Sequence, residues 1–290
     1  MQAGTYELRY RTREGKVLAT RPIKVTPPPT EPGALRVLVD YTRGFGEGSA
    51  VEVILDASGS MLQRQGGKRR IEIAKDTLTS LVGDTIPAGT GFALRVFGHK
   101  ESGSCRTDLE IPLQPLDRAA VKKTLSTIKA MNLAKTPIAA SLEKVASDLA
   151  QVTGDRIVIL LTDGEETCEG DPALAIKGLR AQGLAVRVNI VGYAIDDQDL
   201  QKTFESWAAL GKGQYLNAPD GAQLAQALRQ ALAIPFEVFA GDKLVSRGVS
   251  GGEDLSLPAG TYRLVYRQAG KESEKAVKVA SKTRVEVSIP

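Results

Sequence analysis

The 290-residue chain has few aromatic residues, a single histidine, two cysteines and no long apolar run. No stretch approaches the roughly 18 apolar residues that a membrane helix needs, so we expect no membrane span. Aromatic residues make up 5% of the chain and are not interleaved with basic residues, which argues against base stacking and nucleic-acid binding. The net charge of +4 is mild, and we interpret its one tight basic cluster, Lys68-Arg69-Arg70, as a solvated helix start.

The chain also lacks the signatures of common catalytic sites. Ser58 or Ser60 as a nucleophile would need a base and an orienting acid, and the single histidine, His99, offers no such triad. There is no GxxxxGK[ST] phosphate loop, no GxGxxG fingerprint and no zinc-type spacing of cysteine and histidine. We therefore expect that the protein is not an enzyme.

The cysteines bear on the compartment. Cys105 and Cys168 could be two buried thiols, or they could form a disulfide, which would place the protein outside the cytosol. No secretion signal precedes Gln2-Ala3-Gly4-Thr5-Tyr6, which has a β pattern, so we expect a mature form or an excised fragment. At this point both states of the cysteines stay open.

A long central segment, residues 35–234, alternates between strand and helix patterns. Its strand-like runs are Ala50–Asp56, Phe92–Gly98, Asp155–Thr162, Ala185–Tyr193 and Gln214–Asn217. Apolar stripes at helical spacing lie between them, and Asp171-Pro172 is typical of a helix N-cap and first helical residue. Alternating β and α units predict an α/β fold with a doubly wound, mostly parallel, Rossmann-like sheet.

The ends of the chain have a different character. Residues 235–290 show short alternating runs separated by turn signals, which predicts a small antiparallel β module. Residues 1–26 repeat part of it, since Ala3–Tyr10 matches Ala259–Tyr266. Residues 27–34 are rich in proline and predict a stiff, extended linker.

Oxygen-bearing side chains follow several of the predicted strands. Asp56, Ser58 and Ser60 come directly after the first central strand, Thr136 precedes a helix, and Asp163 ends the most apolar strand. Ligands of a doubly wound sheet bind beyond the carboxyl ends of its strands, so these three loops should meet at one edge. Carboxylate and hydroxyl oxygens suit Mg²⁺ or Mn²⁺. Taken singly, each residue could equally be a helix cap or a turn residue.

In their order and strand contexts these five residues resemble the metal-ion-dependent adhesion site (MIDAS) of a von Willebrand factor type A domain. The resemblance covers residues 44–234. It implies that Ser58, Ser60 and Thr136 ligate Mg²⁺, with Mn²⁺ or Ca²⁺ as alternatives, while Asp56 and Asp163 hold these ligands in place. It also implies an open metal position that captures an Asp or Glu side chain of a protein partner.

Further residues are expected beside this site. Glu165 and Glu166 would tune its field or be solvated loop acids, and His99 would line its rim or be an ordinary surface residue. Because the loops carrying Cys105 and Cys168 belong to the metal-site edge, we now expect a disulfide between them. A disulfide would make the domain periplasmic or extracellular.

The leading hypothesis is therefore a bacterial-type metal-dependent adhesion or binding protein. The flanking modules, which resemble small immunoglobulin-like or carboxypeptidase-regulatory-like domains, would act as spacers or added contact surfaces. One alternative is an assembly or chaperone subunit that works with an ATPase in the cytosol, which predicts reduced cysteines. Another is a metal that only staples the loops together.

Overall fold

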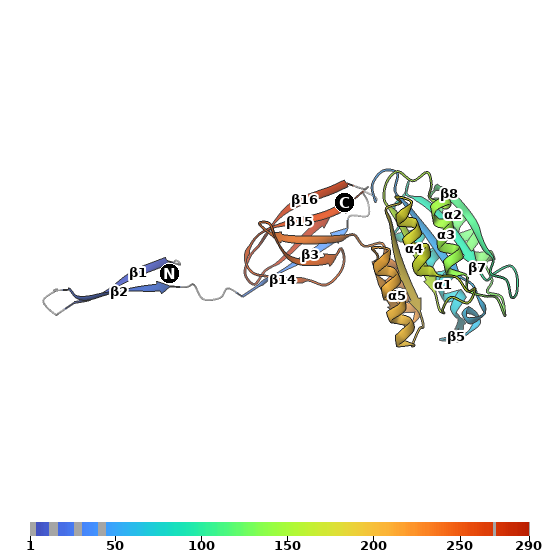
Figure 1. The fold of residues 1–290 in the computed structure, drawn as a ribbon, viewed down its shortest axis with the longest axis horizontal. Helices are drawn as coiled ribbons and strands as arrows, with labels where there is room; N and C mark the ends of the chain where they lie inside the picture. Colours follow the sequence, from blue (N-terminus) through green and yellow to red (C-terminus); the bar gives the residue numbers. More distant parts are fainter. Residues whose placement is uncertain (1–3, 12–16, 26–30, 40–44, 269–270, 290) are drawn as a thin grey trace.

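The computed structural model describes residues 4–11, 17–25, 31–39, 45–268 and 271–289. Figure 1 shows an α/β domain at one end of the molecule, a β module beside it and a two-stranded hairpin at the other end. No helix among the described residues has the length and apolarity to cross a membrane.

The α/β domain is built on a six-stranded sheet. In spatial order its strands are β11 (Tyr215–Ala218), β10 (Val186–Tyr193), β9 (Arg156–Thr162), β4 (Ala50–Asp56), β7 (Gly91–Phe97) and β8 (Thr107–Pro115). All neighbours are parallel except β7 and β8. Every residue of the central strand β4 is buried, as expected for a strand covered on both faces. The predicted doubly wound fold is confirmed.

Helices cover both faces of this sheet (Figure 1). One face packs against α1 (Arg70–Asp84), α2 (Arg118–Thr127) and α6 (Gly221–Ala231). The other packs against α3 (Ile138–Asp148), α4 (Pro172–Ala181) and α5 (Gln198–Leu210). The predicted cap of α4 is confirmed, because the Asp171 side chain accepts a hydrogen bond from the Leu174 backbone at 2.9 Å. Our sequence analysis did not predict β8 or α2.

The β module consists of two sheets around a separate apolar core. One has the order β13 (Lys243–Val249), β12 (Pro235–Ala240), β15 (Gly260–Gln268), β16 (Lys271–Val279). The other has the order β14 (Leu255–Leu257), β3 (Gly33–Val39), β17 (Arg284–Ile289).

The position of β3 corrects our domain boundary at residue 35. β3 pairs in parallel with β17 and antiparallel with β14, so residues 35–39 lie in the β module and not in the α/β domain. The α/β domain is therefore inserted into this module, after its first strand. Residues 33 and 34, which we assigned to the linker, also belong to β3, and residues 27–30 of that linker lie outside the described residues.

The N-terminal repeat is visible in the pairing register. β1 (Gly4–Arg11) and β2 (Val17–Val25) form an antiparallel hairpin in which Gly4 is opposite Val25. The matching residue of the β module, Gly260 in β15, is opposite Val279 in β16. The sequence repeat therefore corresponds to the same hairpin in the same register from Gly4 to Tyr10, after which the register of the N-terminal hairpin shifts.

Candidate metal site

The candidate site starts where β4 ends. Asp56, the last residue of this buried strand, has no solvent exposure. Its Oδ1 accepts a hydrogen bond from the Ser58 backbone N–H at 2.8 Å, and its Oδ2 accepts one from Thr162 Oγ1 at 2.6 Å. The carboxylate therefore fixes the loop that follows its own strand and is itself held by the neighbouring strand β9.

The two serines of this loop contact each other, and Ser60 also reaches a second carboxylate. The Ser58 and Ser60 hydroxyl oxygens lie 3.1 Å apart. Ser60 Oγ also donates to Asp163 Oδ1 at 2.5 Å, across 103 residues of sequence. Ser60 is the second residue of the 3₁₀ turn Gly59–Leu62, and Asp163 directly follows β9. The structure thus brings four of the five predicted site residues into one connected group.

Thr136, the fifth predicted site residue, lies on the loop that precedes α3. The Gly59 backbone N–H donates to the carbonyl of Ala134 at 3.4 Å, which places this loop against the serine loop. The Thr136 backbone N–H donates to Thr167 Oγ1 at 2.7 Å, and its carbonyl accepts from the Thr167 N–H at 3.2 Å. Both backbone polar groups of Thr136, its N–H and its carbonyl, are therefore bonded to Thr167. Neither of these two bonds involves the Thr136 hydroxyl.

Two residues at the site were missed by our sequence analysis. Thr162, fully buried, holds Asp56, and its only signal is its place directly before Asp163. Arg70 Nη1 lies 2.9 Å from Asp163 Oδ2, and its side chain is only 17% exposed. Our interpretation of Lys68-Arg69-Arg70 as solvated holds for Lys68, whose side chain is 63% exposed, but is wrong for Arg70.

Burial disfavours the charged form of both carboxylates. Burial, together with the nearby charge of Asp163, raises the pKa of Asp56 to about 7, although hydrogen bonds from Ser58 and Thr162 oppose the shift. Burial also raises the pKa of Asp163, against the hydrogen bonds from Ser60 and Arg70. In the part of the chain that the structure describes, the cation in contact with this pair of acids is the Arg70 guanidinium, at 2.9 Å from Asp163 Oδ2.

This donor set fits a small, hard cation. Mg²⁺ binds oxygen at about 2.0–2.1 Å in near-octahedral geometry, so adjacent ligands lie about 3 Å apart. The two serine hydroxyls meet this spacing at 3.1 Å, and the two carboxylates supply the charge that a dication compensates. The residues would fit a MIDAS-type metal site, and they do not distinguish one hard divalent ion from another.

Comparison with known proteins identifies the family of the α/β domain. The profile of the von Willebrand factor type A domain matches residues 51–230. The chain belongs to this family. The type A domain is 38% identical to the uncharacterised protein YwmD of Bacillus subtilis over 187 residues, which cover 61% of this chain and 82% of YwmD. It is 33% identical to the uncharacterised YwmC of the same organism over 178 residues, or 58% of this chain and 76% of YwmC.

Solved structures share the fold. A von Willebrand factor type A protein from Catenulispora acidiphila has a TM-score of 0.53 at 17% identity and covers 90% of this chain and 76% of its own. An aerotolerance-related membrane protein from Bacteroides fragilis has a TM-score of 0.51 at 23% identity, over 63% of this chain and 98% of its own. At these identities the likeness concerns the fold alone.

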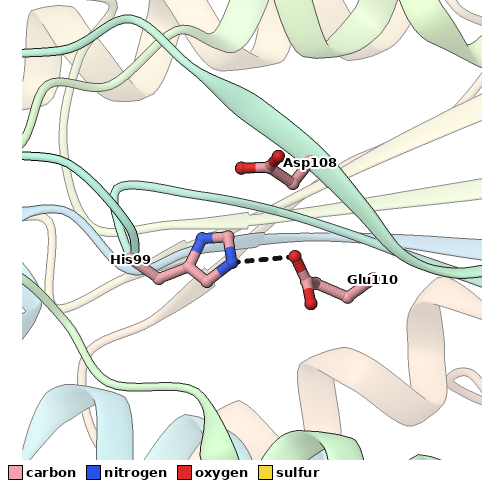
Figure 2. A group of neighbouring side chains, drawn as sticks. All are labelled: His99, Asp108 and Glu110. Atoms are coloured by element: carbon pink, nitrogen blue, oxygen red, sulfur yellow. Dashed lines mark hydrogen bonds and ion pairs between the residues drawn. The ribbon is translucent and has the colours of Figure 1, made fainter.

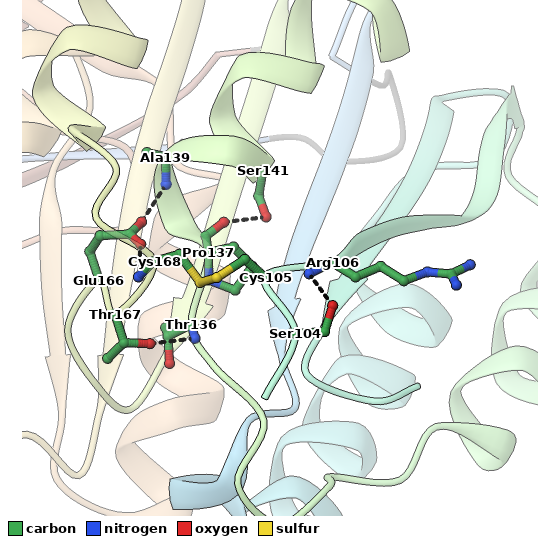
Figure 3. Close-up of a disulfide and its surroundings, with 10 residues drawn as sticks. All are labelled: Ser104, Cys105, Arg106, Thr136, Pro137, Ala139, Ser141, Glu166, Thr167 and Cys168. Atoms are coloured by element: carbon green, nitrogen blue, oxygen red, sulfur yellow. Dashed lines mark hydrogen bonds between the residues drawn. A yellow bond between two sulfur atoms is a disulfide. The ribbon is translucent and has the colours of Figure 1, made fainter. Parts of the chain in front are cut away.

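A disulfide secures the third loop of the type A domain (Figure 3). Cys105 and Cys168 are bonded, as we expected, with an S–S distance of 2.08 Å and Cα atoms 5.8 Å apart. Glu166 lies beside this bridge, where its carboxylate accepts hydrogen bonds from the backbone N–H groups of Ala139 at 2.8 Å and Cys168 at 2.6 Å. Glu166 therefore closes its own loop onto the start of α3 and is not a free rim acid. Glu165 is exposed.

His99 belongs to a separate cluster with Asp108 and Glu110 (Figure 2). Its Nε2 lies 3.0 Å from Glu110 Oε1, and its side chain is only 6% exposed, so it is not an ordinary surface residue. Lys100 Nζ lies 2.5 Å from Glu110 and 3.5 Å from Asp108. Burial raises the pKa of Asp108, but Arg106 and Lys100 outweigh this effect and hold the pKa below its usual value. Cations of the protein thus already compensate these acids, and the cluster acts as an ion-pair network joining β8 to the loop after β7.

Proposed function

We propose that this protein is a metal-dependent binding module that captures an acidic side chain of a protein partner through Mg²⁺ held by Ser58, Ser60 and Thr136. The observation that carries the proposal is the contact between two serine hydroxyls in front of two buried carboxylates. Neutral hydroxyl ligands leave much of the charge of a dication uncompensated, so the ion still favours an incoming carboxylate. A cage made of carboxylates would not have this preference.

Binding without catalysis is the second part of the proposal. A hydrolytic use of Ser58 or Ser60 would need a nearby general base. The imidazole of His99 is engaged with Glu110 instead, and Asp163 receives the Ser60 hydrogen bond while it is also paired with Arg70. We expect no turnover of common ester or phosphoester substrates by the purified protein.

The disulfide supports an exported protein. A bond between Cys105 and Cys168 persists in the periplasm or outside the cell, and it is rare in the cytosol. The alternative of an ATPase-assisted assembly factor in the cytosol requires these thiols to be reduced. Thiol labelling under denaturing conditions of protein purified from its host separates the two, because only the exported form should be blocked.

Metal-dependent capture is tested by a pull-down from the native envelope, in Mg²⁺ and in EDTA. Thr136→Ala removes one proposed ligand and leaves the backbone bonds of the loop in place. Thr127→Ala, an exposed hydroxyl in α2, is the matched control. We expect capture in Mg²⁺ by the wild-type protein and the control, and none by Thr136→Ala or in EDTA.

The same variants address a metal that only staples the loops. If capture by the wild-type protein is equal in Mg²⁺ and EDTA, the proposal is wrong. If Mg²⁺ raises the melting temperature of the wild-type protein without changing capture, the metal is structural. Asp163→Ala would then lower the melting temperature and leave capture unchanged.

A further inference from the structure

Arg70 has a position that the metal-capture proposal does not use. Its Nη1 lies 2.9 Å from Asp163 Oδ2, while the Ser60 hydroxyl lies 2.5 Å from the other oxygen of the same carboxylate. The guanidinium and one proposed metal ligand therefore flank a single carboxylate. The Arg70 side chain is 17% exposed, whereas that of Asp163 is fully buried.

Most of the hydrogen-bonding capacity of Arg70 is unused. A guanidinium has five N–H donors in a planar fork that matches the two oxygens of a carboxylate. In the described structure its contact is with Asp163 through Nη1. Its Nε is buried without an acceptor and is closed to an external ligand, whereas Nη2 has no acceptor among the described residues and is not enclosed. Nη2 can therefore donate to an acceptor that arrives from outside the chain.

The charges at the site define that acceptor. Summed over the site, a bound dication, Arg70 and the ionised carboxylates of Asp56 and Asp163 leave one net positive charge. The neutral hydroxyls in direct contact with the ion do not reduce that charge. A carboxylate carries one negative charge and two oxygens, and the metal binds only one of them in the proposed mode. A neutral amide would leave the charge of Arg70 uncompensated.

We propose that Arg70 is the second anchor for the captured carboxylate and binds the oxygen that the metal does not take. This inference rests on the proposed function. Arg70 would make the site selective for carboxylates over neutral oxygen ligands of the same shape. A guanidinium also fixes the plane of the carboxylate, so the partner side chain would be held in one orientation.

The test uses acetate as the probe and acetamide as its neutral analogue. In ¹H–¹⁵N spectra of the full chain, the Arg70 Nε–Hε signal is followed during acetate titration at constant ionic strength, with Mg²⁺ and with EDTA. The variants are Arg70→Gln, Arg70→Lys and Lys68→Gln. The last removes one positive charge two residues away, from a side chain that pairs with Asp76 outside the site. Mg²⁺ affinity of each variant is measured separately by calorimetry.

We expect the Arg70 signal to shift and saturate with acetate only in Mg²⁺, and not with acetamide. Arg70→Gln should bind acetate about tenfold or more weakly, as expected for a lost charge-assisted hydrogen bond. It should bind Mg²⁺ at least as tightly as the wild-type protein. Arg70→Lys should fall between the two, and Lys68→Gln should stay within about twofold of the wild type.

Two results overturn the inference in distinguishable ways. Acetate binding that needs Mg²⁺ but is equally tight in Arg70→Gln rejects the role of Arg70 and leaves the proposed function intact. Absence of any Mg²⁺-dependent acetate binding in the wild-type protein rejects both. If Arg70→Gln does not fold, an unshifted Arg70 signal in acetate-saturated wild-type protein still refutes the inference.

Discussion

Metal binding at this site should compete with a proton on Asp56. Burial and the charge of Asp163 raise the pKa of Asp56 to about 7 in the metal-free protein, and the cation requires the ionised form. Asp56 is therefore mostly ionised at pH 8 and about 99% protonated at pH 5. We expect the apparent affinity for Mg²⁺ to fall roughly 100-fold between these values, or about 2.7 kcal/mol. An aspartate of ordinary pKa would change it by less than about 10%.

Isothermal titration calorimetry measures this competition directly. Titrations in buffers of different ionisation enthalpy report the protons released for each Mg²⁺ bound, and we expect about 0.9 at pH 6 and about 0.1 at pH 8. Asp56→Asn should reduce the release, and the pKa of Asp163, which burial also raises, accounts for what remains. His99→Gln is the control, because it removes the single histidine of the chain, which lies in a separate cluster with Glu110. Equal affinity from pH 5 to pH 8 in the wild-type protein, with no proton release, would refute the reasoning.

Three further results are expected. Thr162→Val keeps the buried shape but removes the hydrogen bond to Asp56, so it should raise the pKa of Asp56 further. Mg²⁺ binding measured by calorimetry should then be about tenfold weaker. Unchanged affinity would show that Thr162 is not needed to hold the acid. Replacing both cysteines by serine opens a loop closed across 63 residues and should lower the free energy of unfolding in urea by about 4 kcal/mol, and a loss below about 1 kcal/mol would contradict this. Arg95 is buried between Asp148 at 2.7 Å and Glu52 at 3.9 Å. Arg95→Met leaves these acids without their cation, so it should lower the free energy of unfolding by about 3–5 kcal/mol in the same assay. An unchanged free energy of unfolding would contradict this.

Much of the candidate site could be predicted from local sequence. Asp56, Ser58 and Ser60 directly follow an apolar strand, and the strand order of a doubly wound sheet brings Asp163 to the same edge. Arg70 could not be predicted in this way, because three consecutive basic residues look equivalent in sequence. The short β5–β6 hairpin (Arg64–Gln65 with Lys68–Arg69) reverses the chain, and the Arg70 N–H then bonds the Gln63 carbonyl, which turns Arg70 toward Asp163.

The parts of the fold that were missed have physical causes. β8 is an edge strand that contains Pro112 and is half-exposed along most of its length, so it lacks the apolar pattern of the central strands. α2 buries only Val121 and Leu125, which is too little for a clear stripe. β3 has a good strand pattern, but its partner β17 lies some 250 residues later. The sequence of a single strand does not predict which distant strand it pairs with.

The insertion of the type A domain after β3 has a consequence for how the chain folds. β3 can pair with β14 and β17 only when the roughly 200 residues between β3 and β12 bring their ends together. If that segment is unfolded, closing it costs the β module about 4–5 kcal/mol of chain entropy, whereas the folded domain holds its two ends near each other in advance. The type A domain should therefore fold first, during synthesis, and keep β3 close to the later strands so that the module can assemble. Any ion that stabilises the domain would then also stabilise the module that carries it.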